Sequence, residues 1–228
     1  MYKRQLHEKM GTFENANTSF HQAARCKRYT NEVLAFSMVK EEELLRATEE
    51  IQNLTYRQGE YKIFKVFEPK ERLIMALPFY DRVVQHMICN AIQPVFENGF
   101  YYHSYACRSG KGMQAASDTL YQWMYETEVK QGLRMYAFKG DISKYFASIP
   151  HDKLKDENRR YIGDKKALML MDDIIDHNGI LPDGVGIPVG NLTSQLFANV
   201  YGNKLDKFCK HVLHIPYFVR YMDCLLYT

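Results

Sequence analysis

Two aspartates stand where apolar segments end, and side chains in such positions can bind a hard cation. Asp141 follows the short apolar run 135–140 and precedes a predicted short helix over 143–149. Asp223 lies at the centre of a predicted strand pair over 217–227. Carboxylates that converge at the ends of neighbouring strands suit Mg²⁺. Two such ions about 4 Å apart assist phosphoryl transfer to a sugar hydroxyl.

The same residues also have a purely structural interpretation. An aspartate between a strand and a helix often caps the N-terminus of that helix, so Asp141 alone does not define a metal site. A rival acidic cluster falls in a helical pattern, where we expect a solvated face; it consists of Asp172, Asp173 and Asp176. The metal hypothesis therefore requires Asp141 and Asp223 to lie on adjacent strands.

The elements that would position the two aspartates follow one another without a regular alternation. Two β-rich runs around Pro69 predict a hairpin over 61–77, and the segment 178–190, rich in Gly and Pro, predicts a loop or a hairpin. Apolar periodicity predicts helices over 31–52, 81–96, 113–129, 154–177 and 191–214. Strands and helices mixed in this way favour the α+β class.

Composition narrows the class of protein only a little. With 228 residues the chain can bury the core of one domain or of two small ones. A net charge of +3 neither requires nor excludes a nucleic-acid partner. Five scattered cysteines without a Cys-x-x-Cys pair favour a reducing cytoplasm. We expect neither a signal peptide nor a membrane-spanning segment, and hence no membrane partner.

Five sequence blocks between about residue 60 and residue 228 resemble, in their order, the reverse transcriptase family. They are Pro69-Lys-Glu-Arg-Leu-Ile-Met-Ala-Leu-Pro78 followed by Tyr80-Asp-Arg-Val-Val-Gln85, then His103-Ser-Tyr-Ala-Cys-Arg-Ser-Gly-Lys-Gly112, Phe138-Lys-Gly-Asp-Ile-Ser-Lys-Tyr-Phe146, Gly186-Ile-Pro-Val-Gly-Asn-Leu-Thr-Ser-Gln195 and Tyr221-Met-Asp223. The second and fourth blocks look most like the enzymes of bacterial and phage diversity-generating retroelements. Related group II intron and retron types share parts of these runs.

The resemblance implies an α+β right-hand polymerase with fingers and a palm, in which helices back an antiparallel palm sheet. On this basis we expect an N-terminal helical extension over 1–60, fingers over 61–130 and a palm over 131–228. The thumb of the family would be absent, because the sequence ends shortly after the last block. A truncated protein, a degenerate gene and a broken reading frame all remain open.

The implied activity is RNA-directed DNA synthesis in a bacterial or phage-infected cytoplasm. The partners would be an RNA template, a DNA or RNA primer and deoxynucleoside triphosphates, together with a small basic accessory protein in the diversity-generating subgroup. Two Mg²⁺ ions would be bound, with Mn²⁺ as a possible substitute. Asp141, Asp223 and the backbone carbonyl of Ile142 would be their ligands.

Four basic residues match positions that contact nucleic acid or nucleotide in the family. Lys70 and Arg72 correspond to fingers residues that grip the triphosphate, and the planar fork of arginine suits phosphate. Without the resemblance they would be an exposed charge pair on a hairpin. Arg108 and Lys111 would hold the template backbone or a phosphate, although a plain basic loop is the alternative.

Four further residues would shape the nucleotide site. Phe146 would lie under the sugar and exclude a ribose 2′-hydroxyl, unless it is simply a core side chain of a short helix. Val189 stands where many relatives have a glutamine that contacts the incoming nucleotide. Because an apolar side chain cannot supply that hydrogen bond, we expect low fidelity. Gly190 and Gln195 belong to the same block.

The sequence departs from the family at Cys224, where a second aspartate is expected. A thiol has a pKa of about 8.5 and is a soft ligand, so it is mostly neutral near pH 7. We therefore expect weak Mg²⁺ binding and strongly reduced polymerisation. A non-catalytic remnant that binds RNA or a protein is the alternative function. A metal-dependent nuclease would share the acidic site but would leave the fingers residues unexplained.

Overall fold

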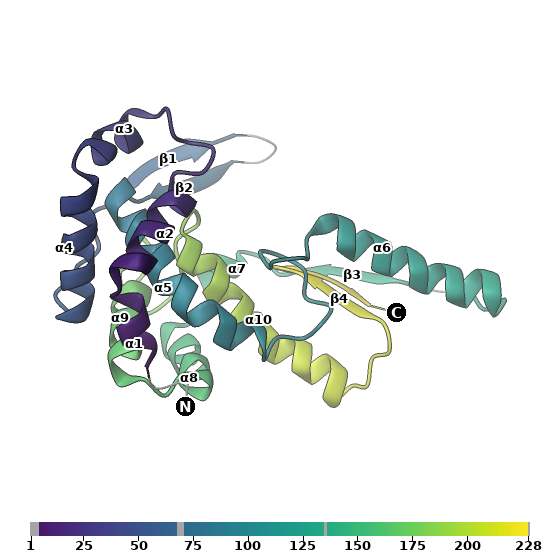
Figure 1. The fold of residues 1–228 in the computed structure, drawn as a ribbon. Helices are drawn as coiled ribbons and strands as arrows, with labels where there is room; N and C mark the ends of the chain where they lie inside the picture. Colours follow the sequence, from purple (N-terminus) through teal and green to yellow (C-terminus); the bar gives the residue numbers. More distant parts are fainter. Residues whose placement is uncertain (1–4, 68–70, 135, 228) are drawn as a thin grey trace. The chain divides into compact units, whose positions relative to one another are not determined.

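The computed structural model describes residues 5–67, 71–134 and 136–227. The chain forms two compact units, each made of two separate stretches (Figure 1). The first unit consists of Met1–Asn98 and Phe146–Leu196, and the second of Gly99–Tyr145 and Phe197–Thr228. The expected division into an extension, fingers and palm stays a prediction.

The first unit is mostly helical and is built around one buried helix. Its helices are α1 (Leu6–Met10), α2 (Phe13–Ala23), α3 (Asn31–Met38), α4 (Lys40–Gln52), α5 (Phe79–Glu97), α7 (Tyr145–Ser148, entered from the second unit), α8 (His151–Tyr161) and α9 (Lys165–Asp176). Helix α5 carries fully buried Val83, Ile88 and Ile92, and α2 packs along it (Figure 1). The predicted helix over 81–96 is thereby confirmed.

The single helix predicted over 31–52 is wrong, because the chain breaks at Val39 between α3 and α4. Val39 has φ −118° and ψ 24°, outside the helical range. Three glutamates, Glu41, Glu42 and Glu43, then fall in the first turn of α4. Carboxylates are favourable there because they face the positive end of the helix dipole. The glutamate run thus favours a new helix start.

The hairpin predicted over 61–77 is confirmed by two strands of the first unit. β1 (Lys62–Val66) and β2 (Arg72–Ala76) pair antiparallel, with Val66 opposite Arg72 next to the turn. The segment 178–190, predicted as a loop or a hairpin, contains no helix or strand among the elements that the structure describes and is therefore a loop.

The second unit holds a three-stranded antiparallel sheet flanked by helices. Its elements are α6 (Met113–Met124), the π-helix η2 (Tyr125–Lys130), β3 (Phe138–Asp141), β4 (Phe218–Tyr221), β5 (Cys224–Tyr227) and the part of α10 (Leu192–His211) that follows residue 196. The strand order is β3-β5-β4. Mixed helices and small antiparallel sheets confirm the α+β class.

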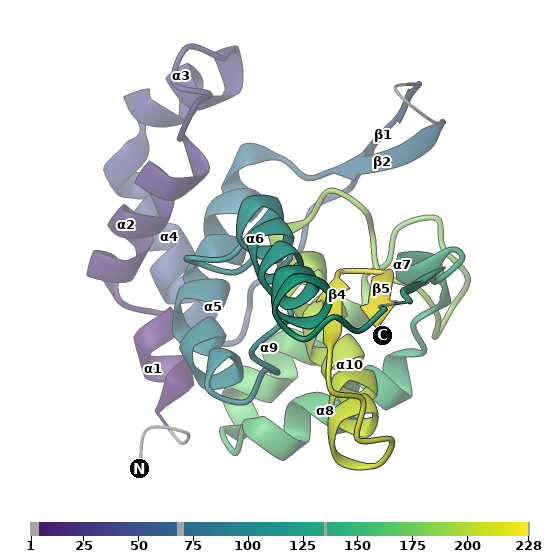
Figure 2. The same ribbon diagram turned by 90° about the vertical axis from the view of Figure 1, so that its right-hand side faces the viewer.

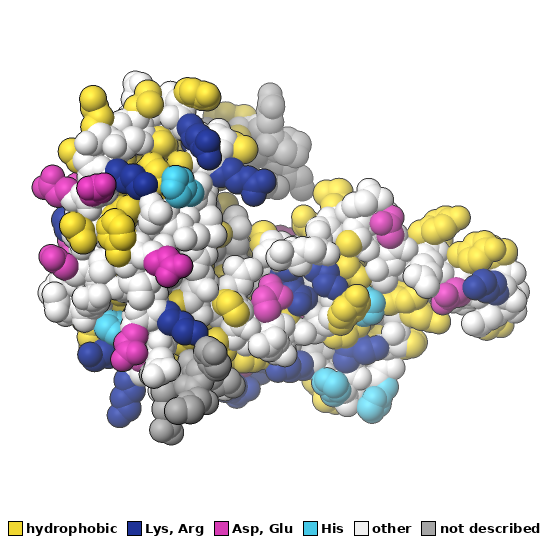
Figure 3. All heavy atoms as spheres, viewed as in Figure 1, with side chains coloured by type: hydrophobic (Ala, Val, Ile, Leu, Met, Phe, Trp, Pro, Cys, Tyr) yellow, Lys and Arg dark blue, Asp and Glu magenta, His cyan; other side chains and the backbone are white. Residues whose placement is uncertain are grey.

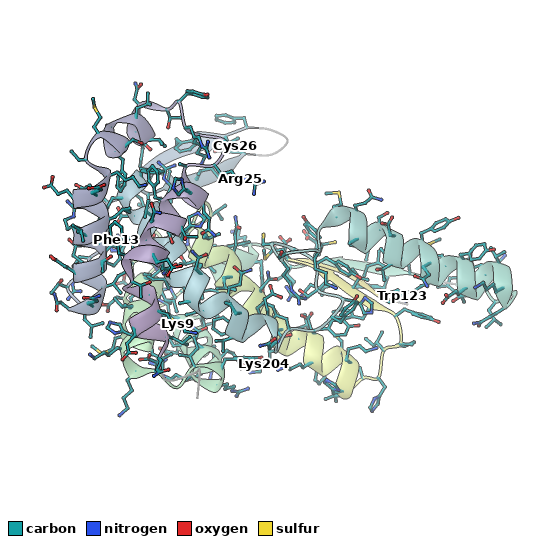
Figure 4. All side chains as sticks on the ribbon, in the orientation of Figure 1. Lys9, Phe13, Arg25, Cys26, Trp123 and Lys204 are labelled. Carbon is teal, nitrogen blue, oxygen red and sulfur yellow. The ribbon has the colours of Figure 1, made fainter. Side chains whose placement is uncertain are left out.

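Helix α6 covers β4 through a small apolar cluster of Tyr105, Ala116 and Val219 (Figure 2). The ring of Trp123, labelled in Figure 4, lies 4.7 Å from that of His103 and 5.1 Å from that of Tyr217. Hydrophobic side chains remain exposed elsewhere on α6 and η2, as Figure 3 shows; they include Met113, Tyr121, Met124, Tyr125 and Val129. Helix α6 is therefore buried mainly on the side that faces β4.

The strand pair predicted over 217–227 is confirmed as the hairpin β4–β5. Tyr221 lies opposite Cys224, so Met222 and Asp223 form a two-residue turn. Met222 has φ +56°, in the left-handed region that favours glycine. No helix in the described part of the chain is long and apolar enough to span a membrane.

Candidate active site

Asp141 and Cys224 form a directly opposed pair between β3 and β5. The amide of Ile142 donates to the carbonyl of Asp223 over 3.0 Å, so the hydrogen bonds flank the pair instead of joining it. In such a non-hydrogen-bonded pair the side chains lie on the same face and approach closest. Cys224, which stands where the resemblance leads us to expect a further aspartate, therefore faces Asp141.

Asp223 sits beside this pair in the turn. Its carboxylate is half-buried and that of Asp141 is exposed. Within the described residues neither carboxylate accepts a hydrogen bond or forms an ion pair, and the Ile142 carbonyl accepts no hydrogen bond there. The charge of Asp223 also acts on the phenol of Tyr145. Burial raises the pKa of this phenol, the charge of Arg220 lowers it, and nearby acidic groups that include Asp223 raise it further. The adjacent aspartates thus offer free oxygen donors.

These oxygen donors have the chemistry that Mg²⁺ prefers in proteins. Among the described residues, no group of three or more His, Cys, Asp or Glu side chains is arranged to hold a metal ion. Mg²⁺ is usually held by one or two carboxylates together with substrate phosphates and water, and rarely by a cage of protein ligands. Asp141, Asp223 and the Ile142 carbonyl stay the predicted ligands of such a site. The Cys224 thiol adds a soft atom where a charged oxygen is expected.

Three of the predicted nucleotide-site residues come together in the first unit, at the loop 186–190. The carbonyl of Val189 accepts a hydrogen bond from the amide of Met75 in β2 (3.1 Å). Gly190 has φ +121°, and a Cβ there would lie 3.1 Å from the Met75 carbonyl oxygen, so only glycine allows this close approach. The carbonyl of Phe146 accepts from the amide of Ile187 (2.9 Å).

The other predicted residues of the first unit are placed less fully. Arg72 begins β2, the strand that the loop 186–190 contacts, and only its backbone is described. Gln195 is half-buried in the first turn of α10. Lys70 lies outside the described residues. The nucleotide-binding roles of all these residues stay predictions.

Arg108 and Lys111, in the second unit, both contact their own loop. One nitrogen of Arg108, Nη1, donates to the carbonyls of Tyr101 (2.8 Å) and Ser104 (2.7 Å). The Nζ atom of Lys111 lies 3.4 Å from the centre of the Tyr102 ring, a cation–π contact. Their role in binding the template stays a prediction.

The rival acidic cluster lies on α9, as its helical pattern predicts. Its carboxylates form ion pairs with basic side chains of the first unit: Asp172 with Arg159, Asp173 with Arg57, and Asp176 with Lys155. These pairs explain the cluster without a metal.

Sequence reasoning missed a buried ion pair behind the β4–β5 hairpin. The side chains of Arg220 and Asp206 are 1% and 0% exposed. The available signal was an arginine inside an otherwise apolar strand, because such residues are rarely buried unless paired. Its partner on α10 could not be identified from periodicity alone.

Comparison with known families identifies the chain. The sequence model described as "Reverse transcriptase (RNA-dependent DNA polymerase)" matches residues 65–228, which is most of the chain. The chain therefore belongs to the reverse transcriptase family, as the sequence blocks predict.

Curated relatives are similar over part of their length. Protein YkfC of Escherichia coli (strain K12) is 28% identical over 134 residues, which cover 56% of this chain and 34% of that protein. The uncharacterized 91 kDa protein in the cob intron of Schizosaccharomyces pombe is 28% identical over 137 residues, covering 58% and 16%. The chain thus matches about a third of the first relative and about a sixth of the second.

A solved structure shows the same fold. A chain of a structure titled "Partial Cas6-RT-Cas1--Cas2 complex" matches with a TM-score of 0.54 and 17% identity. The match covers 97% of this chain and 37% of that one. At this identity the likeness supports the fold alone.

Proposed function

We propose that this chain carries the catalytic centre of an RNA-directed DNA polymerase, with Asp141 and Asp223 as metal ligands. One observation carries the proposal: in a member of the reverse transcriptase family, Asp141 directly faces position 224 and lies beside Asp223. Free carboxylates at the ends of adjacent strands are what phosphoryl transfer to a primer hydroxyl requires.

In this proposal the chain acts mainly by positioning. Asp141, Asp223 and the Ile142 carbonyl would hold Mg²⁺ together with phosphate oxygens of the incoming nucleotide. When bound, Mg²⁺ lowers the pKa of the primer 3′-hydroxyl and neutralises charge on the leaving pyrophosphate. The 3′-oxygen then bonds to the α-phosphorus, the bond to the β-phosphate breaks, and the hydroxyl proton passes to solvent.

Residues of the first unit would bind the nucleotide. Lys70 and Arg72 would grip the triphosphate, as the resemblance to the family implies. Phe146 would pack beneath the sugar and favour a deoxyribose. Val189 and Gly190 would contact the same nucleotide, as the resemblance implies, and their loop is held against β2 through Met75.

Cys224 lowers the activity that we propose for this chain. A thiol is mostly neutral near pH 7 and is a poor ligand for Mg²⁺. The site then has two carboxylates where a third would neutralise further positive charge. We therefore propose slow polymerisation that is faster in Mn²⁺, a metal that accepts a wider range of ligands.

The same observation favours a second candidate function. A family member that has lost one carboxylate could keep the fold as a module that binds RNA or a protein without synthesising DNA. In this alternative Arg108 and Lys111 would contact RNA, whereas Asp141 and Asp223 would have no catalytic role.

Primer extension on an RNA template and a gel shift with the same RNA, each in Mg²⁺ and Mn²⁺, separate the two functions. We expect weak extension that Asp141→Asn abolishes, with RNA binding unchanged. Binding without any extension in either metal would favour the remnant. Extension that survives Asp141→Asn would contradict the proposed site.

We also propose that the chain belongs to a diversity-generating retroelement of a bacterium or phage. The support is the run Gly190-Asn-Leu-Thr-Ser-Gln195 and the run Ser104-Tyr-Ala-Cys-Arg108, which are similar to that subgroup. Its partners would be a template RNA and a small basic accessory protein in the cytoplasm. Co-purification of the chain with an RNA from its own locus would test this assignment.

A further inference from the structure

A buried ion pair lies directly behind the turn that carries Asp223. The Nε and Nη2 atoms of Arg220 donate to the two carboxylate oxygens of Asp206 over 2.7 and 2.8 Å. Burying two charges costs desolvation free energy that their attraction often fails to offset. Burial indeed raises the pKa of Asp206, although the hydrogen bonds from Arg220 oppose this. Net stabilisation alone is therefore a weak explanation for this buried ion pair.

The rest of the guanidinium joins three parts of the second unit. Its Nη1 atom donates to the carbonyl of Met222 in the turn (3.1 Å) and to the side-chain oxygen of Asn199 on α10 (3.2 Å). Its Nη2 atom also donates to the hydroxyl of Ser104 (3.0 Å). A planar fork with five N–H donors can make all these bonds at once, whereas a lysine ammonium cannot.

Helix α10 leaves room for this fork at Gly202. A Cβ at that position would lie 2.7 Å from Nη1 of Arg220 and 2.8 Å from its Cζ. Any side chain at this position would displace the guanidinium. The close packing of a glycine under a charged group indicates that the position of the guanidinium is closely determined.

The turn needs such support because Met222 is in a left-handed conformation, with φ +56°. This conformation costs about 1 kcal/mol or more for a residue other than glycine and persists where the surroundings hold it. The peptide group before Asp223 contains the Met222 carbonyl, which Arg220 binds from inside the unit. The peptide group after it contains the Asp223 carbonyl, which the Ile142 amide binds. Both peptide groups that set the direction of Asp223 are thus held.

We propose that Arg220 is a positioning residue for the metal site: by fixing the Met222 carbonyl it orients Asp223 toward the side of the sheet end where Asp141 lies. This inference rests on the proposed function, because it assumes that Asp141 and Asp223 share a cation. Arg220 is buried, so it would act through Met222 without contacting substrate or metal. Replacing a residue that orients a metal ligand commonly lowers the metal affinity by about 10–100-fold.

Mn²⁺ binding to the intact chain tests the proposal independently of polymerisation, by titration with electron paramagnetic resonance. Arg220→Lys keeps a positive charge near Asp206 but cannot also hold Met222. We expect it to weaken Mn²⁺ binding by about tenfold at a temperature where the variant is fully folded. Ser104→Ala is the matched control, because it removes one bond of the same guanidinium and leaves the Met222 bond. It should lower the melting temperature without changing Mn²⁺ affinity.

Asp223→Asn distinguishes the failure of this inference from that of the proposed function. If Asp223→Asn weakens Mn²⁺ binding and Arg220→Lys does not, the positioning role is wrong and the site stands. If Asp223→Asn leaves Mn²⁺ binding unchanged, the metal site itself is wrong, and the role of Arg220 is wrong with it. Should Arg220→Lys show no cooperative melting, Asp206→Asn replaces it. That variant loosens the guanidinium from α10 and should likewise weaken Mn²⁺ binding, whereas unchanged affinity would overturn the role.

Discussion

Asp141 and Cys224 face each other across β3 and β5 as a pair whose flanking backbone groups, and not their own, form the hydrogen bonds. Side chains in such pairs have Cβ atoms about 4.5–5.5 Å apart. A carboxylate at position 224 would therefore lie within reach of a cation bound by Asp141. The thiol in this position explains why a chain of the reverse transcriptase family is expected to polymerise slowly.

Restoring that carboxylate should restore synthesis. We expect Cys224→Asp to increase the Mg²⁺-dependent rate of primer extension by about a hundredfold or more, the scale of one group that stabilises transition-state charge. The rate is measured at saturating deoxynucleotide on an RNA template. Cys224→Ser, which is similar in size and uncharged, should leave the rate unchanged. Equal rates for the aspartate variant and the unaltered chain would contradict the assignment.

The same substitution should make stability depend on metal. Without a cation, carboxylates at positions 141 and 224 would repel each other, and directly opposed like charges destabilise a strand pair. Cys224→Asp should therefore melt at a lower temperature than the unaltered chain in EDTA, and Mg²⁺ should reverse the difference. Cys224→Asn serves as the uncharged control. A melting temperature of Cys224→Asp that does not respond to Mg²⁺ would show that the two positions share no cation.

The part of the site that sequence could predict is the part that local signals encode. A two-residue turn between apolar strands places Asp223 at a hairpin tip, and an apolar run before Asp141 places it at a strand end. The prediction that Asp141 and Asp223 lie next to each other came from the family resemblance, because strand pairing between distant segments has no local signal. The register that sets Asp141 opposite Cys224 confirms it.

The network around Arg220 could not be predicted in the same way. Its partners Ser104, Asn199 and Asp206 come from two separate stretches of chain, and each fits its own helix or loop without the others. The break at Val39 was missed for a related reason. The apolar periodicity continues across Val39 and predicts one helix, although the glutamates that follow indicate a new helix start. Helix boundaries depend on such terminal interactions, which periodicity does not report.

His103 gives the second unit a defined pH dependence. Burial, together with Lys111 and Lys210, lowers the pKa of this histidine to about 4, and its Nδ1 lies 2.9 Å from the hydroxyl of Tyr105. The unfolded chain keeps a histidine pKa near 6.5. Between about pH 6.5 and pH 4 the unfolded state therefore binds more protons, so the free energy of unfolding falls as the pH falls.

His103→Gln should remove this contribution. Urea unfolding at pH 7 and at pH 4.5 should show a smaller loss of stability in the variant than in the unaltered chain. Lys111→Met should raise the pKa of His103, measured by NMR titration of the ring protons. An unshifted ring titration in that variant would mean that the lysine charge does not act on the histidine.

Val189→Gln tests the proposed low fidelity. The carbonyl of Val189 holds the loop against Met75 and the residue is 36% exposed, so the change adds an amide without disturbing the backbone contact. We expect misincorporation to fall by about fivefold, the effect of one hydrogen bond worth about 1 kcal/mol. Sequencing of products made in the Cys224→Asp background measures it, and Val189→Leu should change nothing. An error rate as high with glutamine as with leucine would contradict the prediction that Val189 lowers fidelity.

Gly202→Ala tests whether the guanidinium of Arg220 is as closely packed as the structure shows. Helix propensity alone predicts that alanine in place of glycine stabilises α10 by about 1 kcal/mol. The new methyl group, however, would lie 2.7 Å from Nη1 of Arg220 and 2.8 Å from the hydroxyl of Tyr145, and overpacking of this kind costs about 1–3 kcal/mol. The steric cost should outweigh the propensity gain, so urea unfolding should show a net loss of stability. A more stable variant would mean that α10 and β4 are less closely packed around Arg220 than described, and the orientation of Asp223 would then need another explanation.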